Sequence, residues 1–260
     1  MITIPPTVPP LPRENVYGRD LPADAPFAWL RAGWRDLVTR PGLSLAYGLA
    51  VFLASLAVVG GMFLLGWDHV LFPALAGFWV VGPVLAIGLY EKSRRLAAGE
   101  PVTLGSMIFV QAKSGGQILF IGALLCLLML VWMRAAVIIY ALFFGVRPFP
   151  GLDHIVPMLF TTPVGWSMLI VGTAVGGLFA ALAFAISAVS IPMLLDQRLD
   201  ALTAMAKSMA LVWHNLPVML IWGAIVLVVV LLGLIPGMLG LIVVFPLLGH
   251  ATWHAYEALR

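Results

Sequence analysis

Long stretches without charge alternate with short polar segments along most of this chain. A helix that crosses the hydrocarbon core of a bilayer needs about 20 predominantly apolar residues. Six stretches meet that length with at most one charged residue each. They predict six transmembrane helices at about 43–65, 71–90, 117–145, 164–195, 216–235 and 238–257.

The last charge-free stretch, 216–249, decides the number of helices. A single helix of that length would measure about 50 Å, which is too long for one crossing of a core of about 30 Å. Pro236 and Gly237 interrupt it, and this pair breaks a helix. We therefore predict two helices joined by a tight outer turn. One long helix, in a protein of five spans, is the alternative.

The positive charges fall on one side of this arrangement. Lys and Arg are enriched in cytoplasmic loops, and with six spans one side receives 12 of the 14 basic residues. The other side receives only Arg147, and Arg134 lies within a span. The distribution predicts a multi-pass protein of a bacterial inner membrane with both termini in the cytoplasm. The 12 residues are Arg13, Arg19, Arg31, Arg35, Arg40, Lys92, Arg94, Arg95, Lys113, Arg198, Lys207 and Arg260.

The fold class that follows is an all-α integral membrane protein, with a six-helix bundle over residues 27–260 as a single domain. Residues 1–26 are rich in proline and are predicted to be a disordered tail. Short amphipathic stretches at 27–40, 103–114 and 200–215 precede the three pairs of spans, with Thr103 and Asp200 as candidate helix caps. They suggest three hairpin repeats, each introduced by an interfacial helix. Chance similarity among apolar segments is the alternative.

Two of these amphipathic stretches gather large apolar side chains on one helical face. In 27–40 the shared apolar face lies opposite Arg31 and Arg35, and in 200–215 a second face of this kind follows Asp200. The first face consists of Leu30, Trp34, Leu37 and Val38, and the second of Leu202, Met205, Met209 and Val212.

Composition agrees with this picture and excludes other classes. The chain is 62% hydrophobic and 10% charged, whereas soluble domains carry about 25% charged residues. The net charge of +3 is scattered, so no nucleic-acid surface is indicated. The single Cys126 lies in an apolar run. No nucleotide-binding, metalloprotease or nucleophile-elbow motif is present in the sequence, so we predict no enzymatic activity and no cofactor.

Arg134 is the most distinctive polar residue, because a basic side chain within a span is costly and marks a candidate functional site. No Asp or Glu lies within a span to pair with it. Extension of its side chain to the outer headgroups is one interpretation. Contact with an anion or a lipid headgroup, in a polar cavity of a small transporter or channel, is the other.

His250 and His254 are four residues apart and share a helix face. This spacing can hold a metal ion or take part in haem ligation. No cysteine or acidic triplet completes a ligand set, and Trp253 and Tyr256 beside them are typical of an interfacial aromatic belt. We name both histidines as weak metal candidates, with anchoring at the interface as the alternative.

The fourth predicted span carries small residues on one face, at Gly172, Gly176 and Ala180. Small residues let helices approach closely in lipid. The face could mediate self-association or binding of another membrane protein, or it could pack within a single bundle.

Four segments carry a family resemblance, namely 29–37 (WLRAGWRDL), 82–91 (GPVLAIGLYE) with Ser93, Arg94 and Arg95, 190–196 (SIPMLLD) and 246–256 (PLLGHATWHAY). They resemble a family of bacterial integral membrane proteins catalogued as domain of unknown function 2189. The resemblance implies an integral membrane protein. Some relatives carry the label of cytochrome c oxidase subunit I, but the five histidines of this chain are divided between the predicted membrane faces.

We therefore expect a non-enzymatic accessory, scaffold or assembly factor of a membrane complex. A small transporter or channel that uses Arg134 is one alternative. A metal- or haem-associated respiratory accessory protein that uses His250 and His254 is the other.

Overall fold

A computed structural model of the chain describes residues 16–145 and 150–260. Most of the predicted proline-rich tail, as well as Arg147, lies outside the described residues. Within them the chain is helical throughout, with twelve α-helices and one short 3-10 helix, which confirms the all-α class.

The first half of the chain contributes two long helices, α2 and α6, separated by shorter ones. Its elements are α1 (Ala25–Val38), α2 (Pro41–Leu64), η1 (Asp68–Val70), α3 (Leu71–Leu85), α4 (Ile87–Ala97), α5 (Leu104–Ile108) and α6 (Gly115–Phe144). The second half contributes α7 (Leu152–Thr161), α8 (Pro163–Ser187), α9 (Ser190–Asp196), α10 (Ala201–His214), α11 (Leu216–Leu234) and α12 (Leu241–Leu259).

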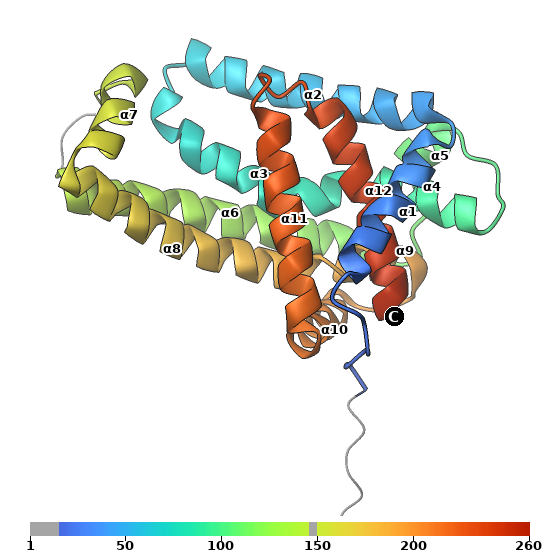
Figure 1. Cartoon of the computed structure of the whole chain (residues 1–260). Helices are drawn as coiled ribbons and strands as arrows, with labels where there is room; N and C mark the ends of the chain where they lie inside the picture. Colours follow the sequence, from blue (N-terminus) through green and yellow to red (C-terminus); the bar gives the residue numbers. More distant parts are fainter. Residues whose placement is uncertain (1–15, 146–149) are drawn as a thin grey trace, which may run out of the picture.

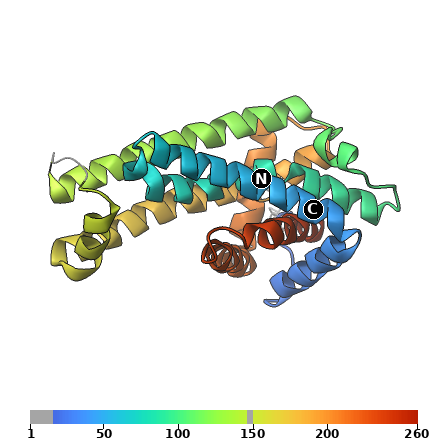
Figure 2. The same cartoon turned by 90° about the horizontal axis from the view of Figure 1, so that it is seen from above.

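The long helices do not all run in one direction. Helices α2, α3, α6 and α8 lie roughly along one another, whereas α11 and α12 cross them (Figure 1). Viewed from above, α11 is seen nearly end-on while α2, α6 and α8 extend across the picture (Figure 2). The predicted six-helix bundle is therefore not confirmed by this arrangement.

Over the described residues, four helical segments are long and apolar enough to cross a membrane, namely α2, α6, α8 continued by α9, and α11. The predicted span 71–90 is divided at Ala86 into α3 and α4. Helix α3 alone measures about 22 Å, which is shorter than the hydrocarbon core. The predicted span 238–257 corresponds to α12, whose second half is polar and buried in protein. Six spans and a threefold repeat are not confirmed and stay predictions.

The interruption predicted at Pro236–Gly237 is present. Helix α11 ends at Leu234 and α12 begins at Leu241. Between them Gly237 and Met238 both adopt a positive φ, a conformation that glycine accepts readily. The single long helix of the five-span alternative is therefore wrong.

Helix α12 is the centre of the packing, and it contacts α1, α2 and α4 along its length. Close approach is possible because glycines lie at each contact. A Cβ atom at Gly33 would overlap Ala251, one at Gly48 would overlap the Ile242 carbonyl, and one at Gly249 would overlap Leu89. These contacts bring α12 against its neighbours at a crossing, where side chains would otherwise hold the backbones apart.

Helix α1 buries only part of the apolar face that the sequence showed. Its buried residues include Trp29, Ala32, Gly33 and Leu37, whereas Trp34 and Val38 are about half exposed. Ala32 and Gly33 permit tight contact with α12, while Trp34 and Val38 can face lipid at no cost.

Helix α10 follows the same rule. It buries Ala201, Ala204, Ser208, Leu211 and Val212 and exposes Leu202 and Met209. The predicted caps are confirmed, since the Asp200 side chain accepts from the Thr203 amide and Thr103 forms a capping box with Ser106.

The small-residue face of α8 is used only in part within the chain. A Cβ atom at Gly176 would meet the Trp132 ring of α6, whereas one at Gly172 would meet nothing within 4 Å. Ala180 is exposed. The Gly172 end of this face is therefore open.

Candidate functional site

Polar side chains from segments far apart in the sequence meet where α1, α2, α4 and α12 pack together. Ser44 of α2, Lys92 and Ser93 of α4 and His250 of α12 are all fully buried. The four helices gather at one end of the molecule (Figure 1). We call these four residues, together with Asp36 and His254, the polar joint.

Hydrogen bonds link the members of the polar joint in series. The Lys92 ammonium donates to Ser44 Oγ at 2.7 Å and approaches the Arg40 carbonyl at 3.4 Å. Ser44 Oγ lies 2.9 Å from His250 Nε2, and Ser93 Oγ lies 2.8 Å from His250 Nδ1. Both nitrogens of the buried imidazole are therefore occupied by hydroxyl groups.

Asp36 and His254 form the edge of the polar joint that reaches water. His254 Nε2 lies 2.9 Å from Asp36 Oδ2, and both side chains are partly exposed. Burial raises the pKa of Asp36, but hydrogen bonds from His254 and Ser93 outweigh it and leave that pKa below its usual value. Asp36 therefore stays an anionic hydrogen-bond acceptor at neutral pH.

Lys92 is the costly member of the polar joint, because its charge is buried without a carboxylate in direct contact. Burial lowers the pKa of Lys92 to about 8, and the Arg40 guanidinium lowers it further while Asp36 opposes the change. Two hydrogen bonds compensate for part of the lost hydration. A buried amine of this kind releases its proton far more easily than an exposed lysine does.

A second charged group lies on the same helix, one residue earlier. The buried carboxylate of Glu91 accepts from Arg94 at 2.8 and 2.9 Å and from Arg95 at 2.5 Å. Arg95 also reaches the Pro101 carbonyl and Glu100. These contacts fix the turn after α4, and they neutralise Glu91 so that it does not compete for Lys92.

The segments that carry most of the basic residues contact one another at this end of the molecule. Asp196 at the end of α9 pairs with Lys113 and Arg260 and accepts from the Tyr256 hydroxyl. Asn215 binds the Arg19 amide and the Tyr17 carbonyl. The first described residues, the loops 98–114 and 197–200 and the C-terminus are thus neighbours.

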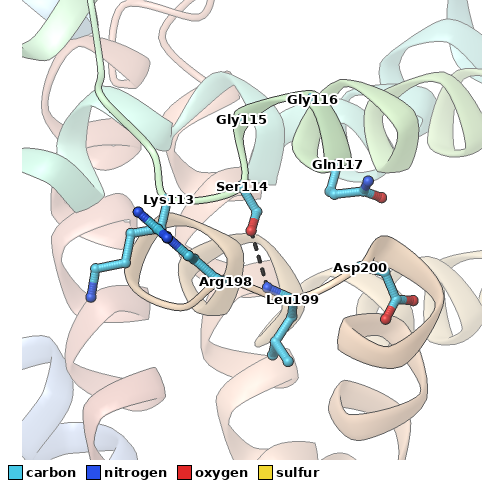
Figure 3. Close-up of a pocket in the computed structure, with 8 residues that line it drawn as sticks. All are labelled: Lys113, Ser114, Gly115, Gly116, Gln117, Arg198, Leu199 and Asp200. Atoms are coloured by element: carbon cyan, nitrogen blue, oxygen red, sulfur yellow. Dashed lines mark hydrogen bonds between the residues drawn. The ribbon is translucent and has the colours of Figure 1, made fainter.

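An open pocket of about 560 Å³ lies beside this group, between the start of α6 and the loop that precedes α10. Figure 3 shows Lys113 and Arg198 at one side of it and Asp200 at the other, with Ser114 Oγ bonded to the Leu199 amide. Charges of both signs line the pocket, so it does not select an anion or a cation. It is separate from the polar joint, whose residues do not line it.

Arg134 is not part of any site that the structure builds. Its side chain is exposed on α6, and no hydrogen bond or ion pair is found for it among the described residues. It does not line the pocket between α6 and α10. The buried hydroxyl of Ser187 on α8 donates to the carbonyl of Ala183 in its own helix.

His250 and His254 do not converge on a common ligand position. His250 is hydrogen-bonded to Ser44 and Ser93, whereas His254 is hydrogen-bonded to Asp36. Within the described ranges, no group of three or more His, Cys, Asp or Glu side chains is placed to hold a metal ion.

Of the polar joint, only His250 and His254 were predicted as candidate site residues. Lys92 was counted as a loop cation, Ser93 entered only through the family resemblance, and Ser44 carries no motif. A signal was nevertheless present, since Lys92 and Ser93 come two and three residues after the apolar run 71–90 and continue its helical period into α4. A charge in that position is a candidate for burial.

Comparison with known proteins gives one match. The model of a family described as "Predicted integral membrane protein (DUF2189)" matches residues 71–196. This confirms the resemblance found in the sequence over α3 to α9, including Glu91, Lys92 and Ser93, while the segments 29–37 and 246–256 lie outside the matched stretch. No curated protein and no solved structure matches the chain.

Proposed function

We propose that this relative of the DUF2189 proteins is a non-enzymatic accessory, scaffold or assembly protein of a bacterial inner membrane. One observation carries the proposal. The polar groups that could perform chemistry are engaged with one another in the buried polar joint, while the long helices expose large apolar side chains. Such a molecule is built to present helix surfaces to lipid and to other helices.

The contacts between the charged segments support a cytoplasmic location of both termini. The positive-inside rule assigns the N-terminal segment, the loops after α4 and α9 and the C-terminus to the cytoplasm. Lys113 and Arg260 share Asp196, and Asn215 binds residues 17 and 19. Segments in direct contact at an end of the molecule lie on the same side of a membrane.

The alternatives have less support. A transporter that uses Arg134 would need that side chain to line a cavity, but it is exposed on α6. A metal or haem site at His250 would have to displace two hydroxyl groups from a fully buried ring.

The open end of the α8 face is the surface that we propose for helix binding. Gly172 has no neighbour within 4 Å of its Cβ position, so Gly172→Leu fits the isolated chain and blocks only an approaching helix. Gly60 of α2 is open in the same way and gives the matched control, Gly60→Leu. Both changes also replace glycine in a helix, so their effects on helix propensity cancel.

The experiment is cross-linking in native membranes, followed by size analysis in mild detergent. We expect the wild type and Gly60→Leu to be recovered in a larger assembly, formed either by copies of this chain or with another membrane protein. We expect Gly172→Leu to be recovered as a monomer. If Gly172→Leu were recovered in the same assembly as the wild type, the α8 face would not be the surface that binds another helix. A monomeric wild type that conducts ions or solutes after reconstitution into vesicles would reject the scaffold function.

A further inference from the structure

The polar joint has chemically different ends. Lys92 carries three N–H donors and no acceptor when charged, and the Asp36 carboxylate is only an acceptor. Between them lie Ser44, His250 and Ser93, and each of these can donate to one neighbour and accept from the other. Because a hydrogen-bonded series of this kind begins at a group that can only donate and ends at one that can only accept, all of its hydrogen bonds run in the same direction, from Lys92 toward Asp36.

The direction determines the tautomer of His250. Ser44 accepts from Lys92, so its hydroxyl proton points to His250 Nε2, which must be unprotonated. His250 Nδ1 then carries the proton and donates toward Ser93. Ser93 in turn lowers the pKa of Asp36, which places its hydroxyl near that carboxylate. The contact with Ser93 of α4 is therefore made by the protonated Nδ1.

We propose that the polar joint is a proton-transfer site, in which buried Lys92 exchanges a proton with water through Ser44, His250, Ser93 and Asp36. In one transfer the Lys92 proton passes to Ser44 Oγ and the Ser44 proton passes to Nε2. The Nδ1 proton passes to Ser93 Oγ and the Ser93 proton passes to the Asp36 carboxylate. Lys92 and Asp36 both become neutral, and His250 changes to the Nε2–H tautomer without becoming charged.

The surroundings provide an outlet at one end of this path. Lys92, Ser44, Ser93 and His250 are sealed from solvent, whereas Asp36 and its partner His254 are partly exposed. Proton exchange with water is therefore expected at Asp36. The lowered pKa of Lys92, about 8, allows its proton to leave near neutral pH.

The titratable groups around Lys92 come from α4 itself and from several of the segments packed around it. They are Asp36 of α1, Arg40 before α2, Tyr47 of α2, His250 and His254 of α12, Asp196 of α9, and Tyr90, Glu91, Arg94 and Arg95 of α4. Helix α5 contributes no titratable side chain. Asp196 and Glu91 are already paired with basic residues, which leaves Asp36 as the base of the path.

The test is nitrogen-15 NMR of histidine- and lysine-labelled protein in lipid nanodiscs. At pH 7 we expect neutral His250 with its proton on Nδ1. We also expect Ser93→Ala to slow the exchange of the Lys92 Nζ protons with water by roughly tenfold, the effect on a rate of losing one hydrogen bond from the path. Ser187→Ala removes another buried hydroxyl, bonded only to its own helix, and should leave this rate unchanged.

Opposite outcomes are equally clear. A His250 imidazolium, or the Nε2–H tautomer at pH 7, would overturn the proposed direction. Equal or faster Lys92 exchange in Ser93→Ala would show that Lys92 reaches water by local opening. Should Ser93→Ala not fold, Asp36→Asn removes the base at the outlet and is expected to slow the exchange likewise.

Discussion

Replacing Lys92 with methionine should remove most of the dependence of stability on alkaline pH. Methionine has a similar length and no charge, and it retains most of the packing at this buried position. In the unfolded chain Lys92 titrates near 10.5, whereas in the folded protein its pKa is about 8. Below pH 8 both states are protonated, so the cost of burying the charge is constant.

Between pH 8 and 10.5 the folded protein loses this proton while the unfolded chain keeps it. Because the unfolded state then binds more protons, the free energy of unfolding rises with pH in this window. A shift of one pKa unit corresponds to about 1.4 kcal/mol, so the rise between pH 7 and pH 10 should be roughly 2 to 3 kcal/mol. Lys92→Met should lack this contribution.

The assay is reversible unfolding in detergent micelles at several pH values from 7 to 10, for the wild type and for Lys92→Met. Other lysines and tyrosines titrate in both proteins, so the difference between the two curves isolates Lys92. The free energies of unfolding of the wild type and of Lys92→Met should converge or cross as the pH rises. Parallel curves would refute the assignment of Lys92 as a buried amine with a lowered pKa.

Three further substitutions, two of them paired with a control substitution, test the packing and the charges in the same unfolding assay. Gly48→Ala places a methyl group against the Ile242 carbonyl and should destabilise the protein by roughly 1 to 3 kcal/mol. The control Gly60→Ala places its methyl group in open space and should stabilise α2 by roughly 0.5 to 1 kcal/mol. Equal effects of the two substitutions on the free energy of unfolding would contradict the close approach of α12 to α2. Glu91→Gln removes the carboxylate shared by Arg94 and Arg95 and should cost about 2 to 3 kcal/mol, while Glu100→Gln, half exposed, should cost less than about 0.5 kcal/mol. Arg134→Leu should change stability by less than about 0.5 kcal/mol because the residue is exposed, and a larger loss would reveal a partner.

Local features of the fold could be predicted because they depend on neighbouring residues. The helix caps at Thr103 and Asp200 and the interruption at Pro236–Gly237 follow from short-range backbone chemistry. The helical class follows from the long apolar stretches. The orientation of α1 could not be predicted in this way, because in lipid the small residues Ala32 and Gly33 pack inward and Trp34 faces out.

The polar joint could not be predicted, because its members are far apart in sequence. Ser44 and His250 are separated by 206 positions, and Ser93 and His250 by 157. Neither serine belongs to a motif, and Lys92 follows an apolar stretch where a solvated loop cation is the usual expectation. Only the close approach of α12 to α2 and α4, which Gly48 and Gly249 permit, brings these side chains together.

The polar joint and the charged segments around it should lie at one membrane face, together with both ends of the chain. The most direct measurement is the location of reporter fusions at the N-terminus, at the C-terminus and in the turn after α11. We predict that both terminal reporters report the cytoplasm and that a reporter inserted at Gly237 reports the opposite side. Termini on opposite sides of the membrane would contradict the contact between Asp36 and His254 and, with it, the polar joint.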